Sequence, residues 1–69
     1  MSYLNSDMSW IIDELIHSER NRKVIKRRLI DGVLFEPLAE EFKLSVRQVK
    51  NIVYKAEKEI YQYIDNNFT

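Results

Sequence analysis

The fold is decided by residues 35–54, which read FEPLAEEFKLSVRQVKNIVY. Within this stretch, Ser45 and Gln48 have the spacing of a capping box. In that motif the serine hydroxyl accepts from the backbone amide three residues on, and the glutamine side chain accepts from the serine amide. Leu44 before the cap and Val49 after it can pack together as a hydrophobic staple. This combination predicts that a helix begins directly after Ser45.

The apolar spacing around Ser45 predicts two consecutive helices. Pro37 is tolerated only in the first turn of a helix, so a short helix should span about 35–43. The helix after Ser45 should run for about five turns before the tail 66–69, because no Gly or Pro interrupts it and apolar residues recur every three or four positions. Those apolar residues are Val49, Ile52, Val53, Ala56, Ile60 and Tyr63 or Ile64.

Two further helices are predicted upstream. One should run from about 7 to 18, capped by Ser6 or Asp7. The other should begin near Asn21 and stop at Gly32, where a left-handed C-cap is expected. Its core-facing residues should be Ile25 and Leu29. We therefore expect an all-α, four-helix fold, with residues 1–69 forming a single domain.

Residues 35–54 also meet the packing demands of a helix-turn-helix. A small residue is needed where the second helix crosses the first, and Ala39 supplies it. Lys43 stands in the tight turn, where glycine is frequent, and a positive φ there would cost on the order of 1 kcal/mol. The pattern therefore predicts a helix-turn-helix at about 35–54 with a long C-terminal recognition helix. The apolar positions that the motif requires are filled by Leu38, Phe42, Leu44, Val49 and Ile52.

The charged residues are balanced in number but segregated along the chain. There are 11 Lys and Arg and 11 Asp and Glu, so the net charge at pH 7 is zero. The segment 20–28 contains Lys and Arg but no acid, and 31–41 contains acids but no cation. In the segment 43–55, all the charged residues are again Lys or Arg. Such segregation can give a neutral protein a local basic face. The net charge therefore argues neither for nor against a nucleic-acid partner.

The composition excludes several classes of protein. The absence of Cys excludes a disulfide scaffold and Cys-ligated zinc, and a single Gly and a single Pro are too few for a turn-rich β fold. There is no Gly-rich phosphate loop, no nucleophile–base set and no metal-ligand cluster, so we expect no enzyme, no cofactor and no metal. Apolar runs are at most triplets, whereas a membrane span takes about 20 residues. Because segment 1–9 also has no cationic side chain, we expect no signal peptide, no membrane partner and a cytoplasmic location.

Two segments carry a resemblance to a known family. Residues 31–42 read DGVLFEPLAEEF and residues 44–56 read LSVRQVKNIVYKA. Together they resemble region four of bacterial sigma factors, especially the extracytoplasmic-function group, and the related LuxR-type regulators. The similarity covers about 24–60, although Leu34 stands where that family usually has a Ser or Thr helix cap. The resemblance implies a bacterial or phage transcriptional regulator that binds double-stranded DNA in a sequence-specific manner and contacts RNA polymerase.

Candidate contact residues follow from the way a helix-turn-helix docks, with the start of its second helix in the major groove. Arg47 can bind guanine O6 and N7, Asn51 can bind adenine N6 and N7, and Val46 can touch a thymine methyl. The predicted base-contacting residues are Val46, Arg47, Lys50, Asn51 and Tyr54. The predicted phosphate-contacting residues, which would supply salt-sensitive affinity, are Arg22, Lys26, Arg27, Lys43, Ser45 and Lys55.

The same residues permit other interpretations. The cations can form an ordinary solvated helix face. The apolar stripe at 49, 53, 56, 60 and 63 has near-heptad spacing, which fits either an internal core or a homodimer interface through the C-terminal helix. The domain can also be a protein-interaction module that docks on RNA polymerase, a sigma factor or another regulator without DNA affinity of its own. If it binds DNA, we expect it to be associated with the nucleoid.

Overall fold

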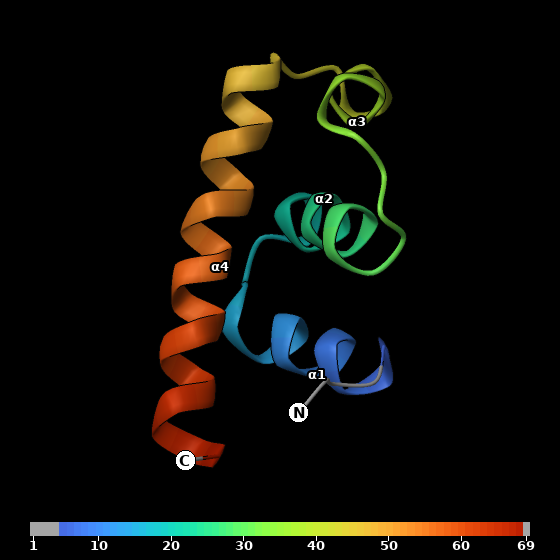
Figure 1. Cartoon of the computed structure of the whole chain (residues 1–69). Coiled ribbons are helices and arrows are strands. Elements are labelled where there is room, and N and C mark those ends of the chain that lie inside the picture. The colour runs from blue at the N-terminus through green and yellow to red at the C-terminus, as the bar shows by residue number, and fades with distance from the viewer. Residues whose placement is uncertain (1–4, 69) are drawn as a thin grey trace.

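The computed structural model describes residues 5–68, and within them the secondary structure consists of helices alone (Figure 1). The expected all-α, four-helix fold is therefore confirmed for this part of the chain. The helices are α1 (Asn5–Leu15), α2 (Glu19–Leu29), α3 (Phe35–Phe42) and α4 (Val46–Phe68).

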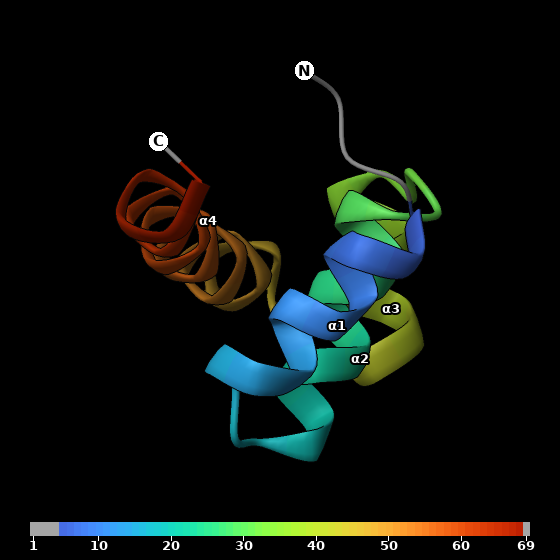
Figure 2. The ribbon, with the colours of Figure 1, turned by 90° about the horizontal axis from the view of Figure 1, so that it is seen from below.

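The long helix α4 forms one side of the molecule, and the three short helices are stacked along it. Figure 1 shows α3 beside the N-terminal end of α4, α2 in the middle and α1 beside its C-terminal half. Figure 2 shows the same division from below, with α4 on one side and the three short helices on the other. The molecule measures 36 × 18 × 18 Å, so α4 spans its whole length. The first turns of α4 consequently lie at one end of the domain, next to α3.

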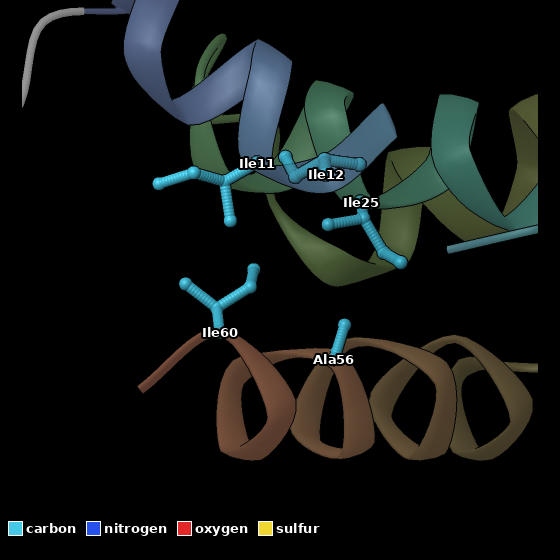
Figure 3. Packing of buried hydrophobic residues seen from close by; sticks show 5 residues of the cluster. All are labelled: Ile11, Ile12, Ile25, Ala56 and Ile60. Atoms are coloured by element: carbon cyan, nitrogen blue, oxygen red, sulfur yellow. The ribbon is translucent and has the colours of Figure 1, made fainter. Parts of the chain in front are cut away.

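Two apolar clusters hold the helices together, and α2 contributes to both. The first joins α1, α2 and the C-terminal half of α4. Figure 3 shows Ala56 and Ile60 pointing from α4 toward Ile11, Ile12 and Ile25. The second joins α2, α3 and the N-terminal half of α4. Its buried residues are Val24, Leu38, Ala39, Val49 and Val53.

The buried face of α2 differs from the expected one. Val24 and Ile25 are fully buried, whereas Leu29 is only half-buried. Ile25 and Leu29 both contact the apolar clusters, as expected, but the sequence did not predict that Val24 is buried as fully as Ile25. Neighbouring residues on a helix point about 100° apart, so Val24 and Ile25 enter different clusters. A helix packed between two neighbours buries two faces, and a single stripe in its sequence cannot describe both.

The boundary between α1 and α2 also differs from the predicted ranges. Ser18 has extended backbone angles and caps α2, accepting a hydrogen bond from the Asn21 amide at 3.3 Å. The helix expected over 7–18 therefore ends at Leu15 and begins at Asn5, so Ser6 and Asp7 lie within its first turn rather than at its cap. The helix expected from Asn21 begins at Glu19.

Gly32 adopts the left-handed conformation that the sequence predicts, with φ of 74°. The Val33 amide closes the end of α2 by donating to the Arg27 carbonyl at 3.1 Å, a bond that spans six residues. A hydrogen bond of that span around a left-handed residue is typical of a Schellman closure, and glycine makes it without steric cost. This closure turns the chain toward the start of α3.

The helix α4 is longer than its sequence pattern predicts. It runs to Phe68, so most of the segment 66–69 that we expected to be a tail is helical. Its buried residues Val49, Val53, Ala56 and Ile60 pack against the other helices of the same chain. The near-heptad stripe is therefore occupied within the monomer, and a dimer through it would require the core to open. No helix in residues 5–68 combines the length and apolarity needed to cross a membrane.

Candidate nucleic-acid interface

The turn between α3 and α4 has the geometry that its residues predict. Lys43 adopts the left-handed conformation, with φ of 56° and ψ of 44°. The Leu44 amide donates to the Ala39 carbonyl at 2.9 Å, which closes the C-terminal end of α3. Because Lys43 has a Cβ atom, this conformation is strained by about 1 kcal/mol. The tight turn sets where α4 begins relative to α3.

The capping box at the start of α4 is confirmed. The Gln48 amide donates to Ser45 Oγ at 3.1 Å, and the Ser45 amide donates to Gln48 Oε1 at 2.9 Å. Leu44 and Val49 both belong to the α2–α3–α4 cluster, as expected for a hydrophobic staple. Two of the free amides at the helix start are satisfied in this way, so the first turn of α4 is held in place without a partner molecule.

Four of the five predicted base-contacting residues are exposed on α4. Arg47, Lys50, Asn51 and Tyr54 lie on its solvent side, opposite the buried stripe that begins with Val49. Tyr54 keeps 54% of its surface exposed although it is a large aromatic residue.

Val46 differs from these four residues because it is half-buried against the α2–α3–α4 cluster. It lines an open groove beside the first turn of α3, together with Leu34, Phe35, Glu36, Pro37 and Lys50. Its methyl groups are therefore turned toward α3 rather than along the outer face of α4.

The cations at the start of α4 have no acidic partner. Within residues 5–68, no carboxylate lies within salt-bridge distance of the amino or guanidinium groups of Lys43, Arg47, Lys50 or Lys55. All four side chains are exposed. The N-terminal half of α4 therefore presents uncompensated positive charge, although the chain as a whole is neutral.

The predicted phosphate-contacting cations of α2 are in a different situation. Lys26 Nζ lies 2.7 Å from Asp13 Oδ1 on α1, and Arg22 Nε lies 3.9 Å from the same oxygen. Arg22 also donates to the carbonyl oxygen of Ile16 at 3.0 Å and to that of His17 at 3.4 Å. These carbonyls follow the last residue of α1, where backbone acceptors lack helical partners. Arg22 and Lys26 thus join α2 to α1.

Arg27 joins α2 to α3. Its Nη2 lies 2.8 Å from Glu41 Oε1, and its Nη1 lies 3.1 Å from Asp31 Oδ2. The hydrogen bonds that Arg27 donates to the carboxylates of Glu41 and Asp31 raise the pKa of Arg27 above its ordinary value. The structure therefore places Arg22, Lys26 and Arg27 between helices, apart from the exposed cations of α4.

The sequence pattern did not predict the contacts around the Phe35 ring, which lie beside the exposed face of α4. The Phe35 ring lies between α2 and α4, with the Arg28 Cζ atom 4.1 Å and the Lys50 Nζ atom 5.6 Å from its centroid. Tyr54 meets the same ring edge-on at a centroid distance of 5.9 Å. Arg28 was one of six cations on α2, and no spacing rule distinguishes it from the others. The packing of α2, α3 and α4 brings Arg28 and Lys50 to the same aromatic ring.

The candidate surface is built from exposed side chains. No polar or charged side chain is fully buried within the described residues. Nor does any group of three or more His, Asp or Glu in residues 5–68 have an arrangement that could hold a metal ion. What the arrangement offers is an exposed helix face with free cations and an amide side chain, Asn51, that has two donors and one acceptor.

Comparison with known proteins does not assign the chain to a family. No family model matches the chain, and no curated protein or solved structure is significantly similar to it.

Proposed function

We propose that this protein is a sequence-specific, double-stranded DNA-binding transcriptional regulator, and that α3 and α4 form its helix-turn-helix. The observation that carries the proposal is the uncompensated positive charge of Lys43, in the turn before α4, and of the exposed cations Arg47, Lys50 and Lys55 in the N-terminal half of α4. The resemblance of residues 31–56 to region four of sigma factors supports the same function.

The dimensions of the exposed face agree with binding in the major groove. Residues 47–54 form two turns of helix, about 10 Å long, and the major groove of B-DNA is about 12 Å wide and admits one helix. Arg47 and Asn51 are four residues apart, so their side chains project from the same side of α4. Arg47 would bind a guanine and Asn51 an adenine, each through two hydrogen bonds.

Local charge rather than net charge would supply the affinity. Phosphate neutralisation releases counterions, and this term makes DNA binding weaken as salt is raised. Lys43 and Lys55 flank the base-reading residues and are free to contact phosphates on either side. Because the acids elsewhere on the chain repel DNA, we expect only the α4 face to approach the duplex, with weak binding in any other orientation.

The test is fluorescence-anisotropy titration of the protein against pooled random duplexes at two salt concentrations, followed by sequencing of the retained duplexes. We expect binding that weakens steeply with salt and a recovered consensus site. The variant Arg47→Glu/Lys50→Glu should bind at least 100-fold more weakly, because it places repulsive charge in the interface.

The matched control is Arg20→Glu/Lys23→Glu on α2. Both double variants change the net charge equally, but Arg20 and Lys23 are exposed residues whose hydrogen-bond and salt-bridge partners, Asn21 and Glu19, belong to α2 itself. The control should keep most of its affinity. Equal loss in both variants would show that net charge alone drives binding, and unchanged binding by Arg47→Glu/Lys50→Glu would refute the assigned surface.

A protein-docking module is the second candidate, and one observation favours it. Leu34 is 68% exposed beside the open groove at the start of α3, which Phe35, Pro37 and Val46 also line. An exposed apolar residue next to a groove is suited to a protein partner such as RNA polymerase. No duplex binding even at low salt would favour this function, and capture of purified RNA polymerase that Leu34→Asp abolishes would establish it.

A further inference from the structure

Two cations from different helices meet at one aromatic ring. The Arg28 guanidinium comes from the end of α2 and Lys50 from the exposed side of α4, and they lie 4.1 and 5.6 Å from the Phe35 centroid. Their charges are consequently within about one Debye length of each other, which is ~10 Å at 0.1 M salt. Neither is paired with an acid in the described part of the chain, and Glu36, which lines the adjoining groove, forms no salt bridge with Lys50.

Arg28 is held in place by contacts that leave most of its donors free. Its Nη1 donates to the Val33 carbonyl oxygen at 3.1 Å, and its flat side chain lies against the Phe35 ring. A guanidinium has five N–H donors, so four remain available for an acceptor outside the chain. Because it is half-buried and already ordered, Arg28 would lose little side-chain entropy on binding an anion.

The exposed Lys50 side chain reaches from α4 toward the first turn of α3. Its ammonium group lies over Phe35, a residue of α3, and it lines the groove beside the first turn of that helix. A lysine in this position faces the flank of the recognition helix. On a helix lying in the major groove, the flank is the part nearest the sugar–phosphate backbone, whereas the outermost residues, here Arg47 and Asn51, face the bases.

We propose that Arg28 and Lys50 together clamp one backbone phosphate of the bound DNA, with Phe35 as the platform that sets their spacing. This inference rests on the proposed function and revises it, because it assigns Lys50 to phosphate rather than to a base. A phosphate has two non-bridging oxygens, so it can accept from the guanidinium and the ammonium at once. The anion also removes the repulsion between two unpaired cations held near the same ring.

The experiment measures the affinity of Arg28→Gln, Lys50→Gln and the double variant for a duplex retained in the selection and for a scrambled duplex. We expect each single variant to weaken binding on the order of tenfold, since each loses a charged hydrogen bond. The weakening should be equal for both duplexes, because a phosphate contact carries no sequence information. Lys23→Gln, which removes an exposed α2 cation paired with Glu19, is the matched control and should bind like the wild type.

A methylphosphonate scan locates the phosphate. Each phosphate of the selected duplex is replaced in turn by the neutral methylphosphonate group. One substitution should weaken the wild type on the order of tenfold yet leave the Arg28→Gln/Lys50→Gln variant unaffected, because that variant has already lost the contact. The double variant should also bind more tightly than the product of the two single losses predicts. Thermal unfolding of each variant shows whether it is folded.

The outcomes separate this inference from the function on which it rests. If the wild type binds no duplex, both are overturned. If the wild type binds but Arg28→Gln binds equally well, or if Lys50→Gln changes the preferred base, only the phosphate clamp is overturned. Phe35→Tyr keeps an aromatic platform and should retain the coupling between the two cations, whereas Phe35→Leu should lose it while remaining folded. Retained coupling in Phe35→Leu would contradict the role given to the ring.

Discussion

The helix α2 and the first half of α4 are both rich in cations, but only cations of α2 have acidic partners on neighbouring segments. On α2, Arg22 and Lys26 lie beside Asp13, and Arg27 lies beside Glu41 and Asp31. On α4, none of the described cations before Lys58 has an acidic partner. The difference shows that the density of cations along a sequence does not locate a basic surface. What matters is whether acids from neighbouring helices face those cations.

The largest expected effect is on stability and comes from removing a buried side chain of α2. Ile25 is fully buried between α1 and α4, so Ile25→Ala should lower the free energy of unfolding by about 3 kcal/mol through lost burial and a residual cavity. Urea denaturation measures the change. Ile25→Val is the control and should cost about 1 kcal/mol. A loss below 1 kcal/mol for the alanine variant would contradict the role of α2 in joining the two clusters.

The next test compares the two serine N-caps, Ser45 and Ser18. Ser45→Ala should cost about 1 kcal/mol, because it breaks one half of the reciprocal capping box that starts α4. Ser18→Ala at the start of α2 should cost less, since Ser18 accepts one hydrogen bond, at 3.3 Å. Urea denaturation of both variants gives the order. A larger loss at Ser18 would mean that the start of α2 is the more tightly organised of the two.

A smaller and opposite effect is expected at the turn before α4. Lys43→Gly should raise the free energy of unfolding by about 0.5–1 kcal/mol, because glycine adopts a positive φ without the Cβ clash. The same change should weaken DNA binding, since it removes a free cation. Lys43→Ala separates the two effects, because it loses the charge but keeps the strain. Stability and anisotropy measurements that moved in the same direction for Lys43→Gly would contradict this account.

The smallest expected effect distinguishes free from paired cations. Lys55→Gln should reduce the slope of log affinity against log salt by about 0.9, the change for one lost phosphate contact. Lys26→Gln should leave the slope unchanged, because Lys26 lies 2.7 Å from Asp13 and its charge is already compensated. Anisotropy titrations at several salt concentrations measure both slopes. Equal slopes for Lys55→Gln and Lys26→Gln would remove the distinction between the two helices.

Local features of the fold were predictable from the sequence. The capping box of Ser45 and Gln48, the left-handed Gly32 and the strained Lys43 all depend on backbone atoms within a few residues, so short-range chemistry specifies them. The two buried faces of α2 were not predictable in the same way. Val24 is buried because α3 and α4 pack on that side of α2. The sequence of α2 alone does not predict which helices will pack against it.

The candidate site divides in the same manner. The exposure of Arg47, Lys50 and Asn51 was predicted, because they lie opposite an apolar stripe on the same helix. The pairing of Arg27 with Glu41 was not, because the two residues are 14 positions apart and belong to different helices. The Phe35 platform likewise joins residues of α2, α3 and α4. Each of these contacts required the packing of helices that are separate in sequence.

The amino-acid sequence alone therefore specifies the four helices to within a few residues, how α4 starts and which of its faces is polar. These properties follow from hydrogen bonds and side-chain periodicity over three to seven residues. The tertiary structure alone decides which cations remain free and which residues meet at Phe35. Electrostatic compensation depends on distances through space, and a carboxylate on a neighbouring helix neutralises a cation as effectively as one in the next turn.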